Sequence, residues 1–166
     1  MAGPPLSLKA RALGLLAQRE HSASELRRKL LRHAQRQQRE LADDAADEVP
    51  EVDPAHQIDE LIAWLQAHRY LSEERFVESR IHARAARYGN LRIRQELAQH
   101  GLTLGADAAQ TLRDSELERA LQVWQRKYST PPADANERAR QSRFLAQRGF
   151  SPEVIARVLR RAAQRD

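Results

Sequence analysis

The chain has 166 residues, of which 31% are charged and only 5% are aromatic, and it contains no cysteine. This composition disfavours a β-sandwich, which needs many aromatic and β-branched residues, and it excludes disulfides and thiolate metal sites. The formal net charge is +5, but residues 41–60 carry eight acidic side chains and no Lys or Arg, which leaves 28 basic residues against 15 acidic ones elsewhere. Most of the chain should therefore attract a polyanion or an acidic protein surface.

In residues 1–71, apolar residues at helical spacing predict helices at about 7–19, 22–34 and 54–69. Ser22 opens a Ser-x-x-Glu capping pattern, and Asp53 precedes a proline at the expected first position of the third helix. Residues 35–53 are polar, contain blocks of like charge and include Pro50. They predict a flexible acidic linker that interrupts this part of the chain, and an extension of the preceding helix through Arg39 stays open.

The remaining helices are predicted at 72–88, 90–100 and 105–113, and then at 115–128, 135–148 and 152–163. Ser115 and Ser151 are the expected N-caps of two of them, since a capping box follows Ser115 and a proline follows Ser151. Gly101 and Gly149 suit the left-handed position just beyond a helix end.

Short internal matches indicate a repeat: LAQHGL at 97–102 matches LAQRGF at 145–150, and SELRRKLLRHA at 24–34 matches LRIRQELAQHG at 91–101. Leu30, Leu97 and Leu145 mark three units of three helices each, at 1–71, 72–114 and 115–166. Such small units cannot bury their apolar faces alone. We therefore expect an all-α protein in which tandem three-helix repeats stack as an elongated, curved, solenoid-like array.

Three separated blocks carry a resemblance to a known family. REHSASELRRKL, YLSEERF followed by YGNLRIRQEL, and FLAQRGF resemble, in this order, the RecX family of bacterial regulators of the RecA recombinase. The acidic segment 35–53 is longer than the connection expected there. The resemblance otherwise spans nearly the whole chain.

The resemblance implies a protein that is not an enzyme and needs no cofactor. It would lie along the groove of the RecA filament on single-stranded DNA and inhibit recombinase, ATPase and co-protease activities, with roles in DNA repair, homologous recombination and the SOS response. The expected protein is a cytoplasmic monomer. It should be soluble, since no segment approaches the ~18 apolar residues of a membrane span. The resemblance also leaves open a contact with single- or double-stranded DNA.

Candidate binding residues are mainly arginines, because the guanidinium group forms paired hydrogen bonds to carboxylates and phosphates. The stretch RYGNLRIRQELAQHGL at 87–102 is the strongest candidate for binding. Any single arginine in it is better explained as part of a solvated helix face, whereas the group of arginines favours a function. The candidates for contact with the partner or DNA are Arg28, Arg32, Arg80, Arg84, Arg87, Tyr88, Arg92, Arg94, Arg143 and Arg148.

An alternative function stays open, namely a helical module that binds nucleic acid without sequence specificity. It predicts aromatic rings interleaved with basic residues, and only Tyr88 and Tyr128 are suitably placed for this. Trp64, Trp124, Phe76 and Phe144 are expected in the core. The six histidines have neither H-x-x-x-H nor H-E-x-x-H spacing, so no metal site is indicated, and no catalytic residues are predicted.

Overall fold

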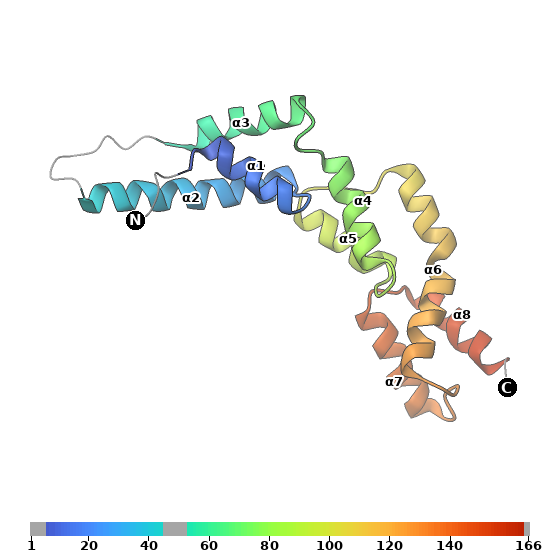
Figure 1. Cartoon of the computed structure of the whole chain (residues 1–166). Helices are drawn as coiled ribbons and strands as arrows, with labels where there is room; N and C mark the ends of the chain where they lie inside the picture. Colours follow the sequence, from blue (N-terminus) through green and yellow to red (C-terminus); the bar gives the residue numbers. More distant parts are fainter. Residues whose placement is uncertain (1–5, 45–52, 165–166) are drawn as a thin grey trace. The chain divides into compact units, whose positions relative to one another are not determined.

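The computed structural model describes residues 6–44 and 53–164, in which every regular element is an α-helix (Figure 1). The helices are α1 (Leu8–Gln18), α2 (Ala23–Asp44), α3 (Ala55–Ala67), α4 (Glu73–Arg84), α5 (Asn90–Gln99), α6 (Ala106–Lys127), α7 (Ala135–Gln147) and α8 (Pro152–Ala163). The prediction of an all-α protein is confirmed.

The chain divides into two compact units, residues 1–76 and 77–166, and the boundary falls within α4. In the first unit α2 packs against both α1 and α3 (Figure 1). The apolar side chains of these three helices form one core together with Leu71, which follows α3; the helical members are Ala12, Leu26, Leu30, Ala34, Ile58, Ile62 and Leu65. Trp64 is partly buried against this core, as its position on an apolar stripe predicted.

In the second unit α6 packs against α5, α7 and α8, and α7 also packs against α8 (Figure 1). The apolar face of α8 is almost fully buried through Val154, Ile155, Val158 and Leu159. Trp124 is buried beside them, and its indole Nε1–H donates a hydrogen bond to Oε1 of Gln141 at 2.8 Å. The three repeat anchors, Leu30, Leu97 and Leu145, are all buried.

Two of the predicted helices are in fact one. The sequence indicated separate helices at 105–113 and 115–128, whereas α6 runs unbroken from Ala106 to Lys127. Ser115 is therefore not an N-cap. Its hydroxyl donates to the carbonyl of Leu112 at 3.4 Å and accepts a hydrogen bond from Nε of Arg119 at 3.0 Å, which satisfies it inside the helix.

The predicted linker is also too long at its start. The sequence assigned residues 35–53 to a linker and left open a helix through Arg39, and α2 continues as a helix beyond Arg39 to Asp44. The residues QRQQREL are good helix formers, so a polar composition there does not end the helix. Pro50 and the other residues of 45–52 lie outside the described part of the chain.

The capping predictions at Ser22 and Ser151 are confirmed. The hydroxyl of Ser22 accepts the backbone N–H of Glu25 at 3.1 Å, and that of Ser151 accepts the N–H of Val154 at 3.3 Å. The prediction at Asp53 is wrong by one residue: α3 begins at Ala55 with Pro54 at its N-cap, and Oδ1 of Asp53 accepts the N–H of Ala55 at 2.9 Å. Gly101 and Gly149 have φ angles of 70° and 85°, which is the left-handed conformation expected beyond a helix end.

Candidate functional site

The turn between α4 and α5, residues 85–89, and the first residue of α5 are held in place by the side chain of Arg119 on α6. The Arg119 guanidinium donates hydrogen bonds to the carbonyls of Ala85 and Tyr88, both at 2.9 Å, and to the side chain of Asn90. Burial lowers the pKa of this half-buried guanidinium from its usual value. The carbonyls of Ala85 and Tyr88 lie outside the helices and need a donor, so Arg119 holds the turn in place by supplying one to each.

Two further side chains of α6 support the same turn. The backbone N–H of Asn90 donates to Oε1 of the buried Glu116 at 3.0 Å. Arg126, two turns further along α6, donates to the carbonyl of Ala86 at 3.2 Å. Side chains of α6 thus bind both a backbone N–H group and backbone carbonyl groups at this turn.

Gly89 and Gly149 lie in close backbone contact, which joins the start of α5 to the end of α7. The N–H of Gly89 donates to the carbonyl of Arg148 at 2.8 Å, and the N–H of Leu91 donates to that of Gly149 at 3.1 Å. A Cβ atom on Gly89 would lie 2.3 Å from the Gly149 oxygen. Only glycine fits here, because a Cβ atom would collide with main-chain atoms.

This contact brings three arginines around one aromatic ring. The guanidinium carbons of Arg92, Arg84 and Arg148 lie 4.3, 5.6 and 5.7 Å from the ring centroid of Tyr88. The first two arginines also pair with Glu96, whose carboxylate lies 3.0 Å from Nε of Arg84 and 3.5 Å from Nε of Arg92. We call Arg84, Tyr88, Arg92 and Arg148 the Tyr88 cluster; three positive charges there face one carboxylate.

A basic pocket lies next to this cluster in the second unit. Its volume is about 200 Å³, and its lining consists of Arg87, Val123, Arg126, Lys127, Phe144 and Arg148. Lys127 and Arg148 also lie near the Phe144 ring, at 5.9 and 5.3 Å from its centroid. We call this cavity the Arg87 pocket. Its described lining includes four cationic side chains and no carboxylate, so it can accept an anion.

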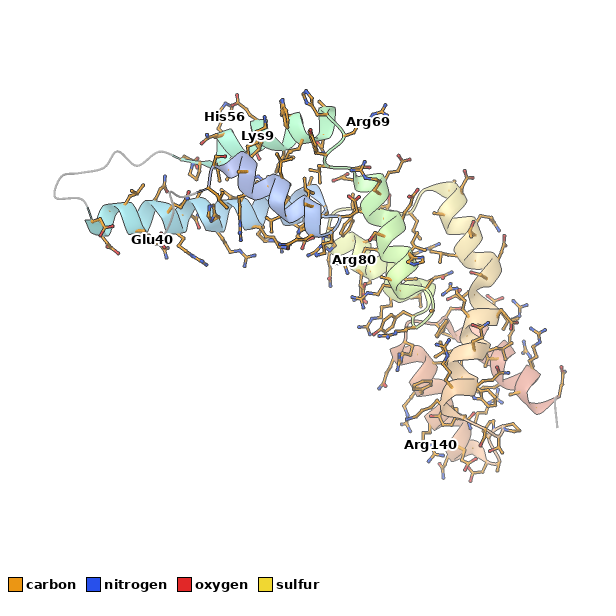
Figure 2. All side chains as sticks on the ribbon, in the orientation of Figure 1. Lys9, Glu40, His56, Arg69, Arg80 and Arg140 are labelled. Atoms are coloured by element: carbon orange, nitrogen blue, oxygen red, sulfur yellow. The ribbon has the colours of Figure 1, made fainter. Side chains whose placement is uncertain are left out.

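The structure does not gather all predicted binding residues at this site. Arg94 is exposed on α5, and Arg80 lies on α4 (Figure 2). Arg143 lines a different cavity of about 310 Å³ between α7 and α8, whose surface is mainly apolar. Arg28 and Arg32 are exposed on α2 in the first unit.

Sequence analysis missed several residues of the site, above all Arg119, Glu116, Arg126 and Lys127. One signal was available, since Arg119 and Arg126 are seven residues apart and so share a face of a continuous helix. That signal was hidden because the helix was divided at Ser115. In the described residues, His, Asp and Glu side chains do not come together in threes that could hold a metal ion.

Family models match two parts of the chain: residues 72–103 match the second three-helix domain of RecX, and residues 114–159 match the third. The regulatory protein RecX of Ralstonia nicotianae is 47% identical over 161 residues, which cover 95% of this chain and 89% of that protein. RecX of Herbaspirillum seropedicae is 48% identical over 164 residues, or 98% of this chain and 95% of that protein.

The crystal structure of RecX from Lactobacillus salivarius superposes on this chain with a TM-score of 0.65 at 18% sequence identity, and the match covers 95% of each chain. This shows that the two proteins share a fold. None of the helices in the described residues combines the length and the hydropathy that crossing a membrane requires. With such identity to curated RecX proteins over nearly its whole length, the chain belongs to the RecX family of regulatory proteins.

Proposed function

We propose that this protein binds the RecA filament on single-stranded DNA, lies along the filament groove, and inhibits the recombinase, ATPase and co-protease activities of RecA. Membership of the RecX family supports the partner. The single observation that carries a binding role is the Arg87 pocket, in which four cations surround one cavity. The protein would act in the cytoplasm as a monomer, without catalysis or cofactor of its own.

The pocket is partly prepared for binding because two of its three arginines have anchoring contacts. Arg126 is anchored on the carbonyl of Ala86, and the backbone of Arg148 is tied to Gly89. Side chains that are fixed before binding lose less conformational entropy when a partner docks. A carboxylate on RecA, or a DNA phosphate exposed in the filament groove, would complete the pocket.

Inhibition further requires that the protein bind one state of the filament better than another. A ligand shifts an equilibrium only by its difference in affinity for the two states. Binding to a surface formed by neighbouring RecA subunits in one filament state would satisfy this condition. The candidate arginines outside the pocket, on α2, α4, α5 and α7, would add weaker contacts along the groove.

The direct test is the ATPase activity of the cognate RecA on single-stranded DNA, titrated with this protein well below RecA stoichiometry. The variant Arg87→Ala/Lys127→Ala removes two exposed cations of the pocket, whereas Arg157→Ala/Arg160→Ala removes two exposed cations of α8. We expect the pocket variant to need roughly tenfold more protein for half-inhibition, equivalent to about 1.4 kcal/mol.

The α8 variant has the same net charge as the pocket variant and should inhibit like the natural protein. Equal loss in both variants would show that overall charge matters and the pocket does not. Absence of inhibition by the natural protein would contradict the proposed function.

The second candidate function is a nucleic-acid-binding module without sequence specificity. It is favoured by the same pocket, since phosphates suit arginines as well as carboxylates do. Binding to single-stranded DNA in the absence of RecA, falling steeply with salt and with no effect on the RecA ATPase, would support this function over the first.

A further inference from the structure

The first unit contains a basic cavity that is separate from the Arg87 pocket. It lies between α1 and α2, has a volume of about 290 Å³, and is lined by Arg11, Leu15, Lys29, Arg32, His33 and Arg36. These six described residues include four cations and no carboxylate. We call this cavity the α1–α2 pocket.

The pocket opens beside a basic stripe on α2. Arg32 and Arg36 are one helical turn apart, and Arg28 and Arg39 continue the same face in both directions. All four arginines are exposed. Positive charge therefore extends along the helix on both sides of the cavity.

Lys29 already has partners within the unit, whereas the arginines of the pocket have no carboxylate partner in the described part of the chain. The Lys29 ammonium lies 3.3 Å from Oε1 of Glu25 and donates a hydrogen bond to Nε2 of His21 at 2.9 Å. Among the described residues, no carboxylate pairs with Arg11, Arg32 or Arg36. Three guanidinium groups at one cavity are thus available to a ligand.

His33 provides an independent observation. Its Nε2 atom is buried, and no described side chain or backbone group forms a hydrogen bond with it. Buried polar atoms normally have a partner. In one tautomer Nε2 carries a hydrogen and can donate to an anion, provided that the surrounding arginine side chains shift slightly.

We propose that the α1–α2 pocket binds a phosphate group of a single-stranded nucleic-acid backbone, with Arg11, Arg32 and Arg36 around its oxygens and His33 Nε2–H as a further donor. The donors come from two helices and converge from different directions. This arrangement suits a tetrahedral phosphate, whose oxygens also point in several directions, better than a flat carboxylate. Neighbouring phosphates would contact the stripe at Arg28 and Arg39.

The proposal does not depend on RecA, so it can fail or succeed separately from the proposed function. The experiment measures binding of the full chain to a fluorescently labelled oligo(dT) by anisotropy, over a series of salt concentrations and without RecA. The natural protein is compared with Arg32→Ala/Arg36→Ala and with the charge-matched variant Arg157→Ala/Arg160→Ala on α8.

Each phosphate contact on a single strand contributes about 0.7 to the slope of log affinity against log salt. Loss of both arginines should remove the single phosphate contact of the pocket and therefore reduce this slope by about 0.7, whereas the α8 variant should keep the slope of the natural protein. An unchanged slope in the pocket variant, or an equal change in both variants, would overturn the proposal.

The imidazole signal of His33, observed by NMR and assigned with His33→Gln, reports on the pocket itself. It should shift when oligo(dT) is added at constant ionic strength, and the shift should be lost in Arg32→Ala/Arg36→Ala. A shift with inorganic phosphate alone, and none with oligo(dT), would overturn the assignment to a nucleic-acid backbone. A shift only with an oligoglutamate peptide would overturn the assignment to phosphate and indicate an acidic protein partner.

Discussion

Glu25, near the start of α2, shows how one buried charge can be stabilised by its neighbours. Burial acts to raise the pKa of its carboxyl, but hydrogen bonds and positive charge from Arg19, with a smaller contribution from Lys29, lower it to about 2. His21 is buried as well, and burial lowers its pKa. Its Nδ1–H donates to the carbonyl of Arg19 while Nε2 accepts from Lys29, so the ring fits this site in its neutral form.

Both residues predict that acid destabilises the first unit. The unfolded chain binds protons more readily than the folded one, since both folded pKa values are lowered, so stability rises with pH. For Glu25 the stabilisation is present above the unfolded pKa of 4.5 and is lost as the pH falls towards 2. We expect a loss of about 2 kcal/mol, less than the full shift implies because Arg19 is partly exposed.

The measurement is urea unfolding followed by the NMR amide signals of α2, at pH 7 and at pH 3. Glu25→Gln should be the less stable protein at pH 7, and the difference from the natural protein should be clearly smaller at pH 3, which lies between the unfolded and the folded pKa of Glu25. Glu40→Gln, which changes an exposed carboxylate on the same helix (Figure 2), serves as the control and should follow the natural protein. A constant difference for Glu25→Gln at both pH values would contradict this account.

At the scale of elements, the periodicity of apolar residues predicted helices well, because a helix that packs on one side must repeat its apolar residues every three or four positions. It did not predict where helices join or end. A Ser-x-x-Glu pattern occurs at a helix start at Ser22 but inside a helix at Ser115, and the difference depends on tertiary packing that the local pattern does not contain.

Two serines test this difference between a helix start and a helix interior. Ser151 caps α8, so Ser151→Ala should destabilise the second unit by about 1 kcal/mol. Ser115→Ala should cost less than half of that, since alanine favours a helix interior and Arg119 keeps its other acceptors. Thermal or urea unfolding of both variants gives the comparison. A larger loss for Ser115→Ala would show that α6 is divided at Ser115, as the sequence first indicated.

At the scale of the whole molecule, the two units carry separate cores and separate basic cavities. The count of charged residues predicted that the chain outside residues 41–60 would be strongly basic. Sequence analysis also named residues 87–102 as the strongest candidate for binding. Neither could place Arg148 beside Tyr88 or Lys127 beside Arg87, because these pairs meet only when α5, α6 and α7 pack together. Arginines that point to solvent and arginines that line a cavity look the same in a sequence.

A substitution at the contact between Gly89 and Gly149 tests whether the two units are stable independently. Gly89→Ala should destabilise the second unit by about 1–3 kcal/mol, because the added methyl group would overlap the backbone of Gly149. Amide hydrogen exchange should become faster in α5, α7 and α8 and stay unchanged in α1, α2 and α3. Gly105→Ala is the matched control, since a Cβ there meets nothing within 4 Å. Faster exchange throughout the chain would show that the units unfold together.

The same glycine contact has a consequence for the order in which the protein folds. It joins residues far apart in the sequence, and the entropy lost in closing such a loop must be spent before the contact forms. Contacts of this kind slow folding, whereas the helices of each unit can form from nearby residues. Before residues 89 and 149 meet, the turn on which the Tyr88 cluster depends lacks its support from α7. The binding surface of the second unit should therefore be among the last parts of the chain to acquire its final shape.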